Sequence, residues 1–155
     1  MFSLFLFLLF AFGLAIGSFL NVVIFRYDGE YSLFSLKKLG GRSHCMHCGV
    51  QLKWYDLIPV FSYIFLCGRC RACKARISPQ YPLIELLTGA AFLLPVLFFY
   101  PQYSFPVLYP NAAIASLLWL VIIMLTIIIA GIDMRLMLIP DEAVIGLSLV
   151  GLALS

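Results

Sequence analysis

Charged residues are scarce in this sequence. Asp, Glu, Lys and Arg make up 11% of its 155 residues, whereas hydrophobic residues make up 64%. Soluble domains carry about 25% charged and about 45–50% apolar residues. The sequence also lacks low-complexity segments and any repeat of domain size. This composition excludes an ordinary soluble domain and predicts an all-α integral membrane protein with one small polar insert.

The amino-terminal stretch lacks basic residues, because no Lys or Arg precedes position 26. A signal peptide carries a basic n-region and a small-residue cleavage site, so residues 1–25 are predicted to form a retained first transmembrane helix. Gly13, Gly17 and Ser18 place small residues at positions i, i+4 and i+5, which suits close contact with another helix. Asn21 is expected to hydrogen-bond a neighbouring helix.

The basic residues are concentrated in one polar insert, residues 26–80. Nine of the ten Lys and Arg lie between Arg26 and Arg76. An excess of Lys and Arg marks cytoplasmic loops, so we expect the insert to face the cytosol and the N-terminus to lie outside. A basic loop can also bind nucleic acid. Between membrane helices the topology signal is the simpler interpretation, and no nucleic-acid partner is expected.

Three apolar stretches follow the insert within residues 81–155. Leu83 to Tyr100 and Ala112 to Ile132 are each about long enough to cross the lipid bilayer, which takes ~20 apolar residues. The segment Pro101 to Asn111 contains three prolines, two tyrosines and no charge, which indicates an external loop with interfacial aromatic residues. Ala143 to Ser155 is too short to cross unaided. The sequence therefore predicts three transmembrane helices and part of a fourth.

An acidic stretch follows the last complete span. Asp133 falls at the membrane edge, where a carboxylate is costly unless it faces water, a partner or a reacting group. Pro140 lacks a backbone N–H and should end or restart a helix. Asp141 and Glu142 then fall in the first turn of the next segment, where negative charge suits the helix dipole. The positions of these acidic residues allow two interpretations. They could serve membrane topology or helix capping, or they could form a functional site.

Four of the five cysteines form two pairs, Cys45-x2-Cys48 and Cys70-x2-Cys73. Two such turns on a short loop supply the four thiolates that tetrahedral zinc requires, and a cytosolic location disfavours disulfides. Because sulfur fills all four positions, the pattern predicts a structural zinc ion. An insert with little core of its own would be stabilised appreciably by the metal.

Three neighbours of these pairs leave alternatives open. His44 and His47 lie beside the first pair and could replace a ligand, although we expect them to be bystanders. Cys67 is a spare thiol. The alternative interpretation of the four paired cysteines is that they are reduced thiols that bind no metal. Two matched C-x2-C spacings on one loop argue against this alternative.

Several motifs, spread over about residues 13 to 146, resemble those of one family, the bacterial type IV prepilin peptidases. GSFLNVVIFR at residues 17–26 looks like the first-helix motif of that family. CMHC at 45–48 with WYDLIP at 54–59, and GRCRAC at 68–73 with ISPQYPLIEL at 77–86, resemble its cytosolic zinc domain. The stretch from Gly131 to Asp141 is similar to the motif that holds the first catalytic aspartate.

The resemblance implies a membrane aspartic endopeptidase of the bacterial inner (cytoplasmic) membrane. It would cleave the leader peptides of type IV prepilins and type II secretion pseudopilins on the cytosolic side. Many members also N-methylate the new N-terminus with S-adenosylmethionine, which makes this cofactor an expectation if that activity is present. No Gly-rich strand–turn–helix pattern locates a site for it.

The family's first catalytic aspartate falls on Asp133. The second belongs to a Gly-x-Gly-Asp motif on a later helix, which this sequence does not contain. Asp141 and Glu85 could approach Asp133, but neither matches that second position, so the 155-residue chain alone is expected to be inactive. The alternative function is a non-catalytic, membrane-tethered zinc scaffold or docking subunit of a pilus or secretion system. A Gly-x-Gly-Asp motif further along the reading frame would favour the enzyme. A stop codon directly after Ser155 would favour the scaffold.

Overall fold

The chain consists of helices joined by irregular segments. A computed structural model describes residues 2–30, 32–33, 35, 40–104 and 112–154. Within these residues there is no β-strand, only two isolated antiparallel bridges. The helices are α1 (Phe2–Arg26), the 3-10 helix η1 (Trp54–Leu57), α3 (Phe61–Phe65), α4 (Gln80–Ser104), α5 (Ala112–Leu136) and α6 (Asp141–Leu154).

Three helices are long and apolar enough to cross a bilayer. Their spans are Phe2–Arg26, Gln80–Phe98 and Ala113–Leu136. Helix α6 is a fourth, shorter apolar helix of 14 residues, which begins directly after Pro140. These elements confirm the predicted fold class: an all-α integral membrane protein with a small insert after the first helix.

Two helix ends differ from the prediction. Helix α4 continues to Ser104, into the segment assigned above to an external loop, and the rest of that segment lies outside the described residues. The proline at position 101 removes only one donor, a loss that membrane helices tolerate. Helix α5 continues past Ile132 to Leu136, because no proline interrupts the chain before Pro140 and because Arg135 in the last turn complements the helix dipole.

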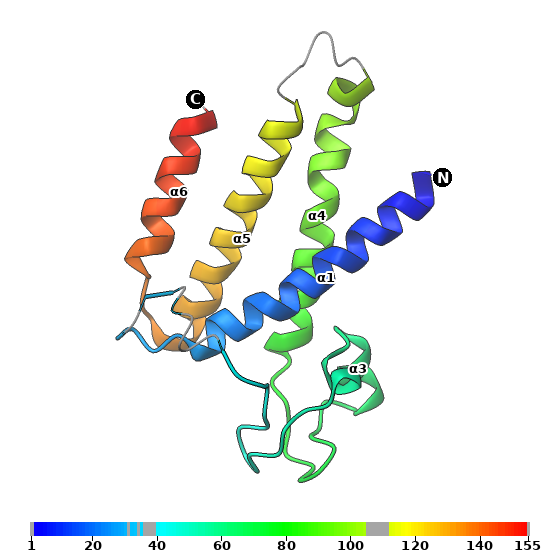
Figure 1. Ribbon diagram of the computed structural model, residues 1–155, viewed down its shortest axis with the longest axis vertical. Helices are drawn as coiled ribbons and strands as arrows, with labels where there is room; N and C mark the ends of the chain where they lie inside the picture. The colour runs from blue at the N-terminus through cyan, green and yellow to red at the C-terminus, as the bar shows by residue number, and fades with distance from the viewer. Residues whose placement is uncertain (1, 31, 34, 36–39, 105–111, 155) are drawn as a thin grey trace.

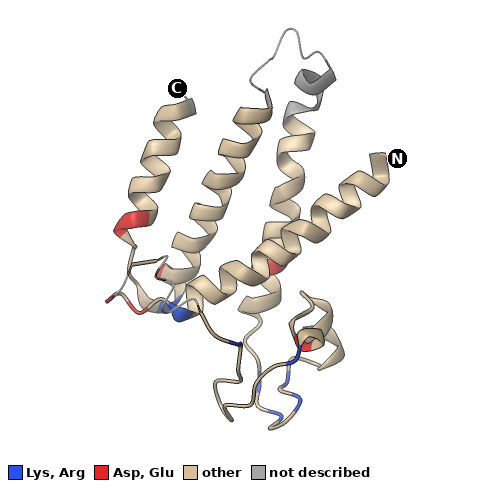
Figure 2. Ribbon diagram, in the orientation of Figure 1, with Lys and Arg blue, Asp and Glu red and all other residues tan. Residues whose placement is uncertain are grey.

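The long helices alternate in direction. Figure 1 shows α4, α5 and α6 standing in a row, with α1 crossing α4 obliquely and the insert suspended from the lower end of the bundle. The end of α1, the start of α4, the end of α5 and the start of α6 all lie at that end. Lys and Arg gather there as well (Figure 2). The insert and the turn after α5 therefore lie at the same end of the helix bundle.

Small residues bring α1 and α4 into close contact. A Cβ atom on Gly13 would lie 2.8 Å from the Cα of Gly89, and one on Gly17 would lie 2.7 Å from the Cα of Glu85. Real Cβ atoms do not approach backbone this closely, so only glycine permits the approach. Nearer the end of α1, the Asn21 side-chain amide donates to the Tyr81 carbonyl at 3.0 Å. Both expectations about the first helix are confirmed.

The interior of the bundle is concentrated at the end that carries the insert. Ile24 of α1 and Ile132 of α5 are completely buried, and they belong to one apolar cluster. A Cβ atom on Gly131 would lie 2.5 Å from the Cδ1 of Ile24, which shows how tightly α5 meets α1 there. In contrast, only 17% of the apolar span of α5 is buried within the protein, so most of its surface is left for lipid or for other protein.

Candidate functional site

The two cysteine pairs meet in the insert. The four Sγ atoms of Cys45, Cys48, Cys70 and Cys73 all lie within 4.8 Å of one another, and Cys45 and Cys73 are 3.9 Å apart. A tetrahedral zinc ion with Zn–S bonds of about 2.3 Å requires S···S separations of about 3.8 Å. Disulfide sulfurs lie at about 2.05 Å, and all four thiols are free. The arrangement therefore fits four ligands around one metal ion.

The first pair sits on a tight backbone turn. The Cys45 N–H donates to the Val50 carbonyl at 2.9 Å, and the Gly49 N–H donates back to the Cys45 carbonyl at 2.9 Å. An isolated antiparallel bridge between His44 and Gln51 closes the turn. The turn carries two of the four sulfurs of the cluster.

The second pair repeats the same pattern. The Cys70 N–H donates to the Ala75 carbonyl at 2.8 Å, the Lys74 N–H donates to the Cys70 carbonyl at 3.0 Å, and a bridge joins Arg69 to Arg76. Every bond is therefore at the same offset from the first cysteine as in the other turn. The sequence spacing predicted the pairing, but it did not predict this shared six-residue frame.

Both turns need a left-handed residue directly after the second cysteine. Gly49 has φ +69° and Lys74 has φ +60°. Glycine adopts this conformation at no steric cost, whereas it costs other L-residues roughly 1–2 kcal/mol. The glycine after Cys48 was a signal for the first turn, but nothing local in the sequence marked Lys74.

Hydrogen bonding separates the acidities of the thiols. The backbone N–H groups of Cys48 and His47 donate to the Cys45 sulfur and lower its pKa to about 6. At Cys73 the Ala75 N–H also favours the thiolate, but burial and the neighbouring thiols outweigh it and raise the pKa to about 11. Four sulfurs this close cannot all ionise by themselves, and a shared divalent cation would allow them to do so.

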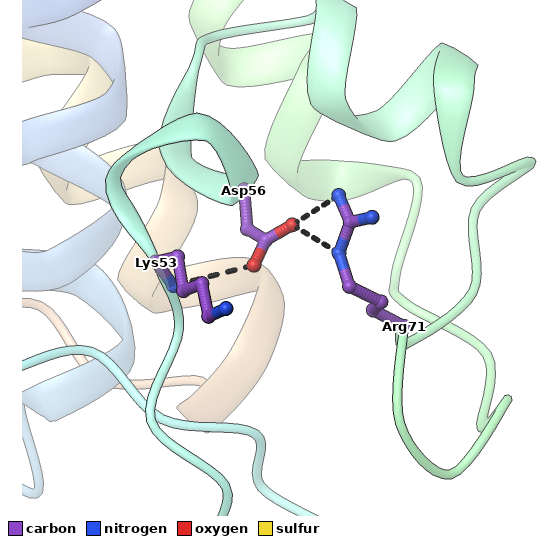
Figure 3. A network of polar contacts seen from close by, with 3 residues as sticks. All are labelled: Lys53, Asp56 and Arg71. Carbon is purple, nitrogen blue, oxygen red and sulfur yellow. Dashed lines mark hydrogen bonds and ion pairs between the residues drawn. The ribbon is translucent and has the colours of Figure 1, made fainter.

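An ion pair locks the second turn to the segment that follows the first. The Arg71 guanidinium donates through Nε (2.8 Å) and Nη2 (2.6 Å) to one oxygen of the Asp56 carboxylate, and the Lys53 N–H donates to the other oxygen at 3.2 Å (Figure 3). The guanidinium also lies 4.9 Å from the centre of the Tyr55 ring. The Asp56 side chain is only 6% exposed. The pair raises the pKa of Arg71 and joins both halves of the insert.

The sulfur cluster does not include the three neighbouring residues whose roles the sequence left open, which are His44, His47 and Cys67. Among the described residues the cluster contains neither histidine nor the spare thiol. The His44 ring lies 3.4 Å from the Arg42 carbonyl. Cys67 is exposed and has φ +50°. The structure therefore brings together the four cysteines that the spacing selects and no others.

The acidic residue singled out in the sequence lies in the last turns of α5. Asp133 is exposed, and no described residue forms a hydrogen bond or an ion pair with its carboxylate. The Asp133 carbonyl accepts the Met137 N–H at 2.9 Å, and Met137 has φ +54°, which ends the helix. The carboxylate is therefore presented to the surroundings at the end of the bundle that carries the insert.

Two polar side chains fix this part of α5. The Arg135 guanidinium donates to the Ile24 carbonyl at 2.6 Å and to the Tyr27 carbonyl at 3.3 Å, which satisfies the end of α1. The Gln80 amide donates to the Gly131 carbonyl at 3.4 Å. Helices α1 and α4 thus hold α5 on both sides of Asp133 through hydrogen bonds to backbone carbonyls.

The other carboxylates near the end of the bundle have different surroundings. Asp141 and Glu142 occupy the first turn of α6. The pKa of Tyr27 is raised by burial, and then by Glu142, Asp141 and Asp28, which places these acids around the end of α1. Glu85 is buried, and its carboxylate accepts the Val60 N–H at 2.7 Å. It is therefore already engaged with the insert.

Comparisons with known proteins agree with this architecture. The profile of the Bacterial Peptidase A24 N-terminal domain matches residues 11–99. A type 4 prepilin-like proteins leader peptide-processing enzyme of Escherichia coli is 50% identical over 95 residues, which cover 53% of this chain and 35% of that protein. A prepilin leader peptidase/N-methyltransferase of Klebsiella pneumoniae is 36% identical over 150 residues, which cover 93% of this chain and 59% of that protein. No solved structure matches the sequence significantly.

The family match covers most of α1, the whole insert and most of α4. The chain spans at most 59% of the length of the relatives described above. The profile match nevertheless includes more than half of the chain, together with both cysteine pairs and the tightly packed α1–α4 contact. The chain therefore belongs to the bacterial peptidase A24 family, whose N-terminal domain it contains.

Proposed function

We propose that this chain is part of a membrane-embedded aspartic endopeptidase that removes the leader peptides of type IV prepilins and type II secretion pseudopilins. Asp133 would supply one of its two catalytic carboxylates. The observation behind the proposal is that this carboxylate is exposed at the end of α5 and has no partner among the described residues. The alignment with the Klebsiella pneumoniae protein supports it, because that alignment covers 93% of the chain and so extends across Asp133.

Hydrolysis by aspartates requires two carboxylates that share one proton. One deprotonates the attacking water while the other polarises the scissile carbonyl. Like charges held close split their pKa values, which keeps both protonation states available. Asp133 can take the water's proton, and we propose that the second carboxylate comes from a Gly-x-Gly-Asp motif on a later helix. By itself the 155-residue chain would then be inactive.

The four cysteines would hold one structural zinc ion in the insert. Their mutual distances fit its tetrahedral geometry, and sulfur fills every position, which leaves no open site for a substrate. The ion would join the two turns that the Asp56–Arg71 ion pair also connects. We propose three parts for the chain: a first membrane helix (1–25), the zinc-binding insert (26–80) and the start of the peptidase domain (81–155). Methylation of the cleaved product with S-adenosylmethionine is a further proposal that rests on the names of the relatives.

We also propose that the insert and Asp133 face the cytosol from the bacterial inner membrane. The concentration of Lys and Arg at one end of the bundle supports this orientation. Cysteine-accessibility labelling tests it. A thiol introduced in residues 101–110 should react only from the outside, and labelling of that thiol only from the cytosol would contradict the orientation.

The decisive experiment replaces Asp133 with asparagine in the complete protein, expressed from its own gene with any segment that follows residue 155. Asn keeps the size of the side chain but cannot accept the water's proton. Leader cleavage should therefore fall by several orders of magnitude, because the two carboxylates act as a unit. Zinc content and yield in detergent should stay unchanged, which separates a loss of chemistry from a loss of folding.

Asp141→Asn is the matched control. Its carboxylate lies in the first turn of α6, where its interaction with the helix dipole contributes about 0.3–1 kcal/mol to stability, so cleavage should persist. If Asp133→Asn still cleaves at the normal rate, the proposed role is wrong. If both substitutions abolish cleavage, the two acids of this stretch form the catalytic pair instead.

A further inference from the structure

We propose that residues 54–65, which comprise η1 and α3, lie in the membrane interface. Their apolar side chains would enter the boundary between headgroups and acyl chains of the same leaflet that α1 and α4 cross. The partner of this surface is therefore the lipid bilayer itself. The proposal is independent of catalysis, because it depends only on the spanning helices and on the contacts of the insert.

The segment exposes an unusual number of large apolar side chains. Trp54 is 77% exposed and Phe65 is 82% exposed. In α3, Phe61, Ile64 and Phe65 are spaced i, i+3 and i+4, so all three lie on one face of the helix. Burying a side chain of this size is worth about 1.5–3 kcal/mol. A surface of this kind marks an interaction site.

A hydrogen bond fixes the depth of this surface. The Val60 N–H, directly before α3, donates at 2.7 Å to the carboxylate of Glu85. Glu85 is the sixth residue of α4, so it lies about 7.5 Å along the helix from Gln80 at 1.5 Å per residue. The apolar span of α4 begins at Gln80, so helix α3 begins about 7.5 Å beyond the start of that span. The apolar faces of interfacial helices enter the boundary between headgroups and acyl chains to a similar depth of about 5–10 Å.

The attachment at Val60 is firm. Glu85 is only 7% exposed, and α1 packs directly against it, because a Cβ atom on Gly17 would lie 2.7 Å from the Glu85 Cα. Val60 itself has φ +62°, an uncommon conformation for a β-branched residue. Such a conformation persists only where the surroundings hold it in place. Two membrane helices therefore hold the start of α3 at this depth.

The charges around the segment suit an anionic lipid surface. Arg69 and Arg76 stand opposite each other in the second cysteine turn, where like charges repel. They line an open cavity of about 600 Å³ with Tyr63 and Ser78. No described acidic residue forms an ion pair with either arginine. Basic side chains beside an apolar face, with Trp and Tyr between them, are typical of segments that lie at a membrane surface.

Depth-dependent fluorescence quenching in nanodiscs that contain anionic phosphatidylglycerol tests the proposal. The full chain has two tryptophans, Trp54 and Trp119. Replacing both with phenylalanine and adding Phe65→Trp gives one reporter on the exposed face of α3. We expect lipids brominated on their acyl chains to quench this reporter and aqueous iodide to leave it unaffected. Retained zinc content in each variant verifies that the insert is folded.

Two references calibrate the measurement. The variant Trp54→Phe keeps only Trp119, which is 45% exposed in the spanning helix α5 and should respond to brominated lipid alone. Met46 is 76% exposed in the first cysteine turn. Met46→Trp in the background without other tryptophans should respond to iodide alone.

The three outcomes at position 65 are distinct. Quenching by brominated lipid, to an extent comparable with Trp119, supports the interfacial position. Quenching by iodide, as for Met46→Trp, overturns it and leaves the apolar face in water. Protection from both quenchers also overturns it, because another part of the protein or a second copy would then cover the face.

Discussion

Replacing Gly49 with alanine tests the geometry of the two cysteine turns. Gly49 has φ +69°, and a Cβ atom added there would meet nothing within 4 Å. The substitution therefore introduces no clash, and its whole effect comes from forcing an L-residue into the left-handed region. That conformation costs about 1–2 kcal/mol.

The cost should appear as weaker metal binding. Because the turn must adopt this conformation to aim its sulfurs, the folding of the turn and the binding of the metal are coupled. At 1.4 kcal/mol per tenfold change, a penalty of about 1–2 kcal/mol weakens zinc binding roughly 5- to 30-fold. Competition with a chromogenic chelator, using the purified protein in detergent, measures the dissociation constant.

The second turn provides the reverse experiment. Lys74 has φ +60° at the equivalent position, so Lys74→Ala removes a charge and keeps the strain, whereas Lys74→Gly removes both. Comparing these two variants isolates the backbone effect, which should make the glycine variant bind zinc more tightly than the alanine variant. The extra flexibility of glycine offsets about 0.5–1 kcal/mol of that gain. The reasoning is refuted if Gly49→Ala binds zinc as tightly as the unchanged protein and Lys74→Gly binds it more weakly than Lys74→Ala.

Further predictions concern the contacts around the site. Gly17→Ala should lower the thermal stability in detergent by several degrees, because its Cβ would lie 2.7 Å from the backbone of α4, whereas Gly151→Ala, with nothing within 4 Å, should not lower it. Asp56→Asn should weaken zinc binding in the chelator assay, because it removes the charge-assisted bonds to Arg71 that join the two halves of the insert. The effect should be modest, because solvent screens the half-exposed guanidinium, and unchanged affinity would argue against the coupling. Removing zinc with a chelator should make the insert sensitive to protease while α4 and α5 stay intact, and cleavage within those helices would contradict a purely structural role.

The sequence by itself determined the class of the protein and its division along the chain. Long apolar runs must satisfy their backbone groups internally in lipid, so they had to form helices. The C-x2-C spacing identified the four cysteines that come together. Pro140 marked the start of α6, because a proline lacks the N–H that a helix interior needs but is tolerated where a helix begins. Each of these conclusions depends on local chemistry that any surroundings would leave unchanged.

The tertiary structure decided what distant residues do to one another. The sequence did not decide the role of Glu85. The structure shows that its carboxylate accepts a hydrogen bond from Val60 of the insert, 25 residues earlier in the chain. Nothing in the local sequence indicates the left-handed conformation of Lys74. The second cysteine turn adopts it because its two sulfurs must meet the two sulfurs of the first turn. The sequence pattern of α3 does not show which way its apolar side chains face. The structure shows that Phe61, Ile64 and Phe65 are exposed and that a hydrogen bond attaches the start of α3 to a membrane helix, because the place of a short helix is set by contacts between helices and not by the pattern within one.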